Sequence, residues 1–177
     1  MADPQAVTPV RRRRRSAALV AFALLVLGCA SLAGSVRKSF REPGEHFEAF
    51  PEEVWKEYEC EGRKLPFFKI ERIELVPRKL HAGDEFNHRI VYALCPERSS
   101  EVLTGRLHTR ILFRGQAVVS ESEPAWEFKP GRWIVDAFVS VPEQAEAGIY
   151  SMELAFESPA LSFEESRTFL VEEPKRR

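Results

Sequence analysis

The sequence lacks the short motifs that accompany the common enzyme chemistries. It has no GxSxG, no HExxH, no Walker-type phosphate-binding loop and no GxGxxG. Groups that could act together in acid–base or metal chemistry are also scarce. Asp84 and Asp136 are the only aspartates after residue 3, and His88 and His108 are the only histidines on expected strands. We therefore expect no enzyme activity, no metal site and no cofactor.

Charge is absent from residues 16–34, a run dominated by Ala, Leu and Val. Arg11 to Arg15 come just before it, and a positive block followed by an apolar run and small residues is typical of a secretory signal. By the positive-inside rule the arginines stay in the cytoplasm and the body crosses the membrane. Because residues 29–177 carry a net charge of about −5, we expect no nucleic-acid partner.

The run Val26-Leu27-Gly28-Cys29 resembles the lipobox of bacterial lipoproteins. The resemblance implies that residues 1–28 are removed as a signal peptide, and that Cys29 receives a diacylglyceryl group and then an acyl chain such as palmitate. Ala30 after the cysteine favours the outer membrane in a Gram-negative cell. Two alternatives stay open: an uncleaved anchor to about residue 36, since residues 16–36 are long enough to span a bilayer, and an ordinary cleaved signal.

Only two other cysteines are present, Cys60 and Cys95, and no CxxC pair indicates a redox motif or a zinc site. In the oxidising compartment that the leader implies, two cysteines in a small domain readily pair. A disulfide closing a loop of this length would stabilise the fold by about 3–4 kcal/mol. The alternative is two free thiols.

The body after the leader divides into four segments. Residues 29–46 are polar with a Pro-Gly break, which is typical of a tether. In residues 47–64, apolar residues recur at spacings of three and four, which predicts a short helix that covers one end or edge of the domain. These residues are Phe47, Phe50, Val54 and Tyr58. Residues 65–173 form the main domain, and 174–177 are a polar tail.

The main domain has an apolar period of two with recurring turn signals, which predicts strands. Seven are expected, at residues 67–76, 86–95, 102–113, 117–121, 132–141, 149–157 and 163–172. No convincing helical pattern separates them. The fold class is therefore all-β, a seven-stranded antiparallel sandwich preceded by the leader or anchor helix and the short helix.

The run Glu146-Ala147-Gly148-Ile149-Tyr150 resembles the tyrosine corner of immunoglobulin-like domains. The resemblance implies an immunoglobulin-like sandwich in which Gly148 permits the turn and the Tyr150 hydroxyl bonds to backbone upstream. Glu146 stands where Asp is commoner in that family. The match concerns architecture and implies no function.

Residues 124–131 are the candidate recognition loop, because Trp126 and Phe128 could form an aromatic platform for a partner or a sugar. The alternative places aromatic rings of this region, Trp133 above all, in the core. Strand arginines could form a stripe for an anionic ligand or simply pair with glutamates. They are Arg89, Arg106, Arg110 and Arg114.

The leading functional hypothesis is an envelope-anchored, non-enzymatic interaction or structural subunit. It would be held at the membrane by lipid or by an N-terminal helix, and its partner would be another envelope protein. One alternative is a ligand- or glycan-binding accessory lipoprotein. An alternative location is the inner membrane, with a signal anchor and a periplasmic body.

Overall fold

A computed structural model describes residues 41–173; the leader, Cys29 and the polar tail lie outside the described residues. The strands are β1 (Gly44–Ala49), β2 (Phe67–Val76), β3 (Lys79–Leu80), β4 (Glu85–Cys95), β5 (Leu103–Phe113), β6 (Gln116–Phe128), β7 (Gly131–Ser140), β8 (Gly148–Glu157) and β9 (Ser162–Val171). The helices are α3 (Pro51–Glu57) and a 3₁₀ helix, Cys60–Gly62.

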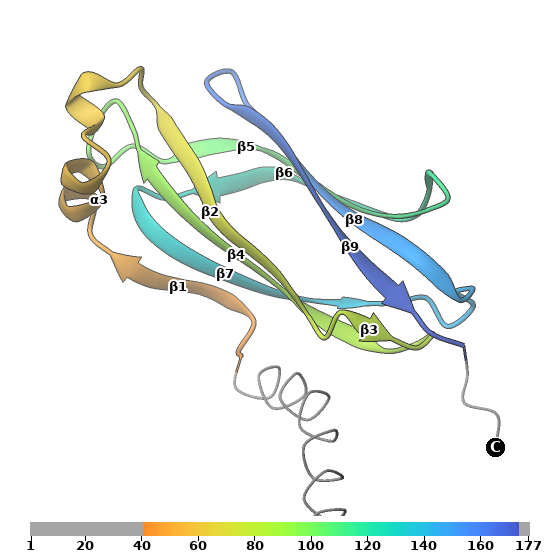
Figure 1. The fold of residues 1–177 in the computed structure, drawn as a ribbon. Helices are drawn as coiled ribbons and strands as arrows, with labels where there is room; N and C mark the ends of the chain where they lie inside the picture. The colour runs from red at the N-terminus through yellow and green to blue at the C-terminus, as the bar shows by residue number, and fades with distance from the viewer. Residues whose placement is uncertain (1–40, 174–177) are drawn as a thin grey trace, which may run out of the picture.

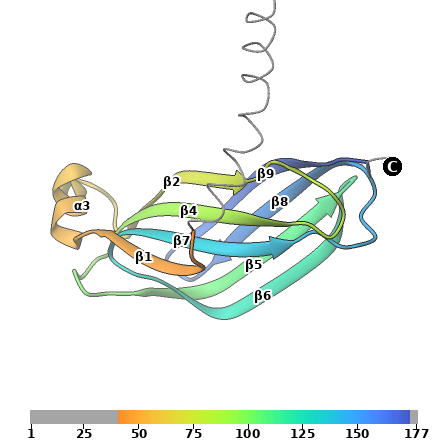
Figure 2. The same ribbon diagram turned by 90° about the horizontal axis from the view of Figure 1, so that it is seen from below.

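The strands form two sheets that pack face to face (Figures 1 and 2). The first sheet has the order β1-β7-β4-β2 and the second has the order β3-β9-β8-β5-β6. Neighbouring strands are antiparallel, except that the short β3 runs parallel to β9. The helix α3 lies at one end of the sandwich, next to β1. The described chain is therefore all-β with two sheets, as the sequence predicts.

The structure corrects the predicted segment boundaries near the start of the domain. Residues 44–49 form the edge strand β1, where the sequence predicts the end of a tether and the beginning of the helical segment. Its register pairs Phe47 with Trp133. The segment has no apolar period of two, and it becomes a strand only by hydrogen bonding to β7, far away in the sequence. The helix begins at Pro51, where the backbone N–H of Phe50 donates to the Glu53 carboxylate over 3.0 Å.

Strand number and length also differ from the prediction. All seven expected strands are present, but β1 and β3 are additional. The fourth expected strand, 117–121, extends to Phe128 in β6, so most of the predicted recognition loop is strand rather than loop. Pro124 lies inside it, which is tolerated because β6 is an edge strand with a register shift opposite Gly105 and Leu107.

A disulfide fastens the helical end to the first sheet. Cys60 and Cys95 are bonded, with their Cα atoms 6.4 Å apart. Both cysteines are buried with Val54 of α3 and Ala93 of β4 in a small cluster. The pairing that the cysteine count predicts is thus present, and it joins the 3₁₀ helix to the end of a central strand.

The turn before β8 has the geometry that the tyrosine-corner resemblance implies. The Tyr150 hydroxyl donates to the Glu146 carbonyl over 2.9 Å, and the Tyr150 ring is buried and stacks on Phe113. Gly148 has a positive φ of 156°, and a Cβ there would come within 2.8 Å of the Phe113 ring. A larger residue at this position would therefore require the Phe113 ring to shift.

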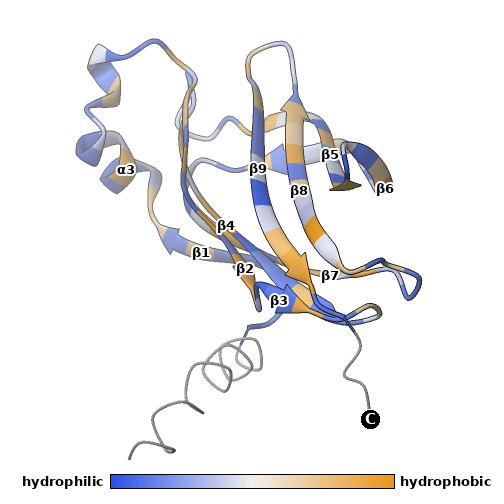
Figure 3. Ribbon diagram, turned by 45° about the vertical axis from the view of Figure 1, so that its right-hand side comes forward, coloured by the Kyte–Doolittle hydropathy of each residue, from blue (hydrophilic) through white to orange (hydrophobic). Residues whose placement is uncertain are grey.

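The interior is divided into two apolar clusters along the length of the sandwich. The cluster away from α3 contains Leu75, Leu80, Phe86, Ile111, Val141, Tyr150, Met152, Phe169 and Val171. The cluster nearer α3 contains Ile90, Tyr92, Leu94, Leu103, Leu107, Phe128, Val135, Leu154 and Phe156. Figure 3 shows the corresponding change along β9, which is hydrophilic at its middle and hydrophobic towards β3.

Candidate functional site

Polar residues occupy the inward-facing positions between the two apolar clusters. On β4, His88 lies between Phe86 and Ile90, and on β5, Thr109 lies between Leu107 and Ile111. Strands β6 and β9 of the second sheet contribute charged residues at the same distance along the sandwich as His88 and Thr109. We call this set the polar belt; its members are His88, Thr109, Glu121, Glu123, Glu165 and Arg167.

A small cavity of about 120 Å³ lies in the polar belt, on the side of β6 and β7. Its polar lining consists of His88, Thr109, Glu121, Glu123 and Trp126, whose buried indole N–H has no hydrogen-bond partner among the described residues. Its apolar walls include Met152 and Leu154. The cavity therefore has a mostly apolar interior with charged groups from one edge strand. Its lining comes from both sheets, so only the packed sandwich creates it.

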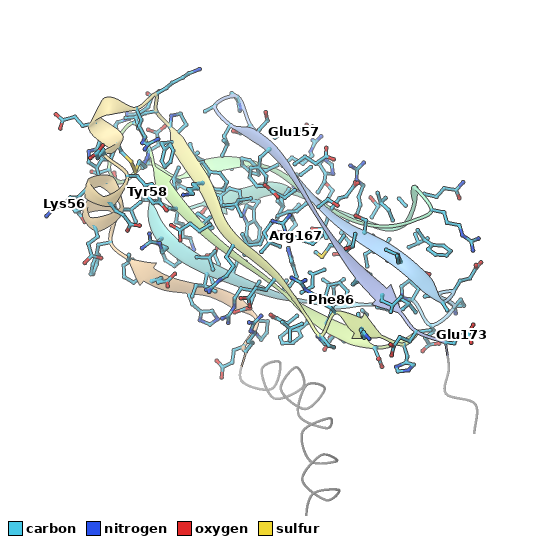
Figure 4. The ribbon with its side chains drawn as sticks, in the orientation of Figure 1. Lys56, Tyr58, Phe86, Glu157, Arg167 and Glu173 are labelled. Atoms are coloured by element: carbon cyan, nitrogen blue, oxygen red, sulfur yellow. A yellow bond between two sulfur atoms is a disulfide. The ribbon has the colours of Figure 1, made fainter. Side chains whose placement is uncertain are left out.

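His88 is the buried titratable group of this cavity. Its side chain lines the cavity and the residue is 5% exposed. Burial, with the positive charge of Arg167, lowers the pKa of the imidazole to about 4. His88 is therefore neutral at physiological pH and can accept a hydrogen bond. Arg167 lies at the middle of β9, while Phe86 lies further from α3 (Figure 4).

Glu121 and Glu123 reach the cavity from the edge strand β6. Glu121 pairs with Thr109 of β5, and Glu123 pairs with Leu107. Both glutamates therefore lie on the interior face of the second sheet, as Thr109 and Leu107 do. Both residues remain exposed to solvent, and within residues 41–173 no ion pair is formed by either carboxylate. Two unpaired carboxylates thus stand beside a largely apolar cavity.

The residues of the predicted recognition loop separate into two environments. Phe128 is 1% exposed and contacts Phe156 and Tyr92 in the core, so it cannot form an exposed platform. Trp126 is half-buried and lines the cavity. The recognition role of residues 124–131 stays a prediction. From the sequence, His88 is considered only as a possible metal ligand, and Glu121 and Glu123 are not singled out; the available signal was a polar residue at an inward position of an alternating strand.

A second feature is a group of aromatic rings around the end of β1, which we call the aromatic patch: the exposed Phe47 of β1, the exposed Phe50 before α3 and the partly buried Trp133 of β7. Phe47 lies 4.8 Å from Phe50 and 5.4 Å from Trp133, measured between ring centroids. Phe47 and Phe50 are 46% and 60% exposed. Lys129 lies over the Trp133 ring and pairs with Glu45. The patch therefore combines large apolar area with charged neighbours.

The expected arginine stripe is largely paired with carboxylates. Arg110 pairs with Glu153 at 2.9 Å and Arg114 with Glu146 at 3.4 Å. Arg89 lies in the other sheet, and its guanidinium binds the buried Asp136 at 2.6 Å. These three arginines therefore form no free anion-binding surface.

The Arg89–Asp136 pair belongs to a polar network on the outer face of the first sheet. Arg41 donates to Asn87 over 2.7 Å and pairs with Glu74. Burial alone would raise the pKa of Asp136, but hydrogen bonds from Arg89 and Asn87 outweigh it and hold the pKa below the usual range. Arg41, the first described residue, is thereby fixed to the sheet.

Neither a metal-binding cluster nor a membrane-spanning helix is present among the described residues. Along residues 41–173 no three His, Cys, Asp or Glu side chains gather closely enough to hold a metal ion. No helix of the described part combines the length and apolar character needed to cross a membrane. The proposed lipid site Cys29 lies outside the described residues.

No family model and no curated protein matches the chain. Similar solved structures include a cycloisomaltooligosaccharide glucanotransferase from Paenibacillus sp., 17% identical with a TM-score of 0.44 over 61% of this chain and 14% of that chain. An alkylpurine DNA glycosylase from Pseudomonas fluorescens is 10% identical, with a TM-score of 0.44 over 60% of this chain and 30% of that one.

A sporulation control protein from Bacillus subtilis is 8% identical, with a TM-score of 0.42 over 60% of this chain and 50% of that chain. The chain thus spans half or less of the length of these three structures. At such TM-scores the similarities carry no argument about function.

Proposed function

We propose that the chain is an envelope-anchored interaction subunit whose body is an immunoglobulin-like sandwich outside the cytoplasm. Two features support the fold assignment. The first sheet joins β2, β4 and β7, while the second joins β9, β8, β5 and β6, which fits the division of strands in immunoglobulin-like domains. The Tyr150–Glu146 hydrogen bond supports it independently.

The disulfide supports the location, because disulfides persist in oxidising compartments outside the cytoplasm. It agrees with the export signal and with the lipobox-like run that ends at Cys29. In this proposal lipid on Cys29 holds the body at the membrane.

The aromatic patch is the observation that carries the interaction role. Aromatic rings are enriched at protein interfaces, and the exposed Phe47 and Phe50 lie on and just after β1, an edge strand. Among residues 41–173 only β7 pairs with β1, so the other edge of β1 is open to an added strand. An extended segment of a partner could therefore hydrogen bond to β1 and cover Phe47 and Phe50.

The charge of the body indicates which kind of partner segment would bind beside the aromatic patch. Residues 41–173 contain 16 Lys and Arg and 26 Asp and Glu, a net charge of −10. Exposed acids flank the patch at Glu48, Glu52 and Glu53. The partner is therefore proposed to present an extended segment that is apolar and basic, since complementary charge speeds association and fixes orientation.

Photo-crosslinking of the full-length chain in its native membrane tests this proposal. A benzophenone amino acid in place of Phe50 should give a discrete adduct, and peptide mapping should identify an extended segment rich in Lys or Arg. Ile149 is the matched control, because it is 71% exposed but lies at the start of β8, outside the patch.

Reversing the acids near the patch provides a second arm. Glu48→Lys with Glu52→Lys should lower the crosslinking yield at Phe50 several-fold, and higher salt should do the same. Equal adducts from Phe50 and Ile149, or an adduct that is insensitive to both charge reversal and salt, would contradict the proposed surface.

A further inference from the structure

We propose that the cavity beside His88 binds an alkylammonium group, with the ammonium between Glu121 and Glu123 and the alkyl chain against Met152 and Leu154. The site is separate from the aromatic patch and does not depend on the partner proposed there. Its evidence is the combination of a cavity, a buried imidazole without a hydrogen bond from residues 41–173, and two unpaired carboxylates.

The size of the cavity limits the ligand. A protein cavity of about 150 Å³ lined by apolar residues accommodates benzene. The cavity beside His88, at about 120 Å³, is slightly smaller. It can therefore take a short unbranched or singly branched alkyl chain, but not a sugar ring with its hydroxyl groups or a fatty acid.

The polarity of the lining selects the charge of the ligand. The walls from β4, β7 and β8 are apolar apart from His88, whereas β6 supplies two carboxylates. A cationic nitrogen would satisfy Glu121 and Glu123 by charge-assisted hydrogen bonds. His88, neutral because burial lowers its pKa to about 4, adds a hydrogen-bond acceptor and no repulsion. An anion would meet both carboxylates and is excluded.

Another role for the two glutamates must be separated from ligand binding. Inward-pointing charges on an edge strand discourage pairing with the edge of a second molecule. In that case Glu121 and Glu123 would matter for the monomeric state and not for any ligand. The two roles make different predictions for the same variants.

An alkylammonium group has two natural sources: a free alkylamine and the side chain of a lysine. They differ in how they can enter the cavity. A free alkylamine can insert its alkyl end and leave the ammonium at the exposed Glu121 and Glu123, whereas a lysine side chain must insert its ammonium first. We therefore use n-butylammonium and Nα-acetyl-lysine-methylamide as probes, with n-butanol as the uncharged control. Tighter binding of n-butylammonium is expected and would identify a free amine as the source. Tighter binding of the lysine derivative would place the ammonium inside the cavity and contradict the proposed orientation.

The experiment is an NMR titration of the ¹⁵N-labelled full-length chain in detergent micelles. We expect saturable shift changes in amides of β4, β6 and β8 around the cavity with n-butylammonium, at millimolar concentrations because the ligand is so small. Binding of n-butanol should be weaker by about tenfold, since it lacks the charged hydrogen bonds. Added salt should weaken the binding of the cationic probe but not the binding of n-butanol.

Variants of β6 complete the test. Glu121→Gln and Glu123→Gln should each lower the affinity for the cationic probe by about tenfold. Glu127→Gln is the matched control, because it removes the same charge from the same strand outside the cavity lining, and it should change affinity by less than about twofold.

Absence of saturable shifts with both cationic probes overturns the inference. So does binding that is equal in wild type, Glu121→Gln and Glu123→Gln, or binding of n-butanol as tight as that of n-butylammonium. If the two variants only promote dimer formation, measured by sedimentation, the glutamates protect the edge of β6 and do not hold a ligand. The salt and n-butanol comparisons use wild type and therefore do not rely on the folding of any variant.

Discussion

His88 shows how a single inward-facing residue changes the character of the core. Its neighbours along the same face of β4, Phe86 and Ile90, belong to the two different apolar clusters. A buried imidazole is costly to protonate, because transfer of a charge into the interior loses hydration. Protonation of His88 is therefore expected to lower the stability of the sandwich.

The buried, neutral imidazole of His88 predicts that the stability of the domain depends on pH. The pKa of His88 is about 4 in the folded protein and about 6.5 in the unfolded chain, so between these values the unfolded chain binds the extra proton. The free energy of unfolding should fall by about 2 kcal/mol from pH 7.5 to pH 5, and by about 3 kcal/mol once the pH is below 4. Urea unfolding at several pH values measures it.

In His88→Gln, most of the decrease in the free energy of unfolding between pH 7.5 and 5 should disappear. In His108→Gln, on the outer face of β5, that decrease should remain. Asp136, Glu71 and Glu74 also have lowered pKa values. Their stabilising effect is lost only as the pH falls below about 4.5, so it does not overlap the upper part of the window. An unchanged slope in His88→Gln would show that another group titrates there.

At the scale of elements, β1 is held at its C-terminal end by the close approach of β7. Gly131, the first residue of β7, has a φ of 95°, which L side chains rarely adopt. A Cβ at Gly131 would lie 2.6 Å from the carbonyl oxygen of Ala49, the last residue of β1. Backbone cannot yield as a flexible side chain can, so glycine is required where β1 meets β7.

Gly131→Ala should therefore reduce the free energy of unfolding by about 2–3 kcal/mol, from left-handed strain together with the backbone clash. Amide hydrogen exchange should accelerate most in β1. Gly62→Ala is the control, since a Cβ there meets nothing within 4 Å, and it should stay within about 0.5 kcal/mol of wild type. Similar losses in both variants would mean that the β1–β7 junction is not the sensitive point.

At the scale of the whole molecule, charge is unevenly divided along the chain. Arg11 to Arg15 precede the apolar run, while residues 41–173 carry a net charge of −10. The first part favours retention on the cytoplasmic side, and the acidic body is repelled by anionic lipid headgroups. Arg41 is bonded to Asn87 and Glu74, so residues 41–46 of the predicted tether belong to the domain.

The proposed membrane location of the molecule depends on lipidation of Cys29, which remains a prediction. Cys29→Ala should abolish labelling by a fatty-acid probe and leave a precursor of uncut length. Cys60→Ser is the control and should still be labelled, because Cys60 is bonded to Cys95 inside the folded domain and the substitution leaves Cys29 in place. Normal processing and release of Cys29→Ala would exclude lipidation and favour one of the other two leader types.

The sequence alone determined the features that depend on short-range pattern. Alternating apolar residues define the seven main strands, because a strand with one buried face must alternate. The resemblance of residues 146–150 to a tyrosine corner implies the Tyr150 turn. The two cysteines of the body predict a disulfide, with two free thiols as the alternative, and the structure contains the disulfide. These properties need no knowledge of which strands pack together.

Tertiary structure alone decided the rest. Segment 44–49 is a strand because β7 offers it a partner, and Phe128 is buried because β6 continues past its expected end. His88 and Glu121 lie far apart in sequence and meet at one cavity only when the two sheets pack. Such contacts arise from long-range pairing and register, which the alternation along any single strand does not encode.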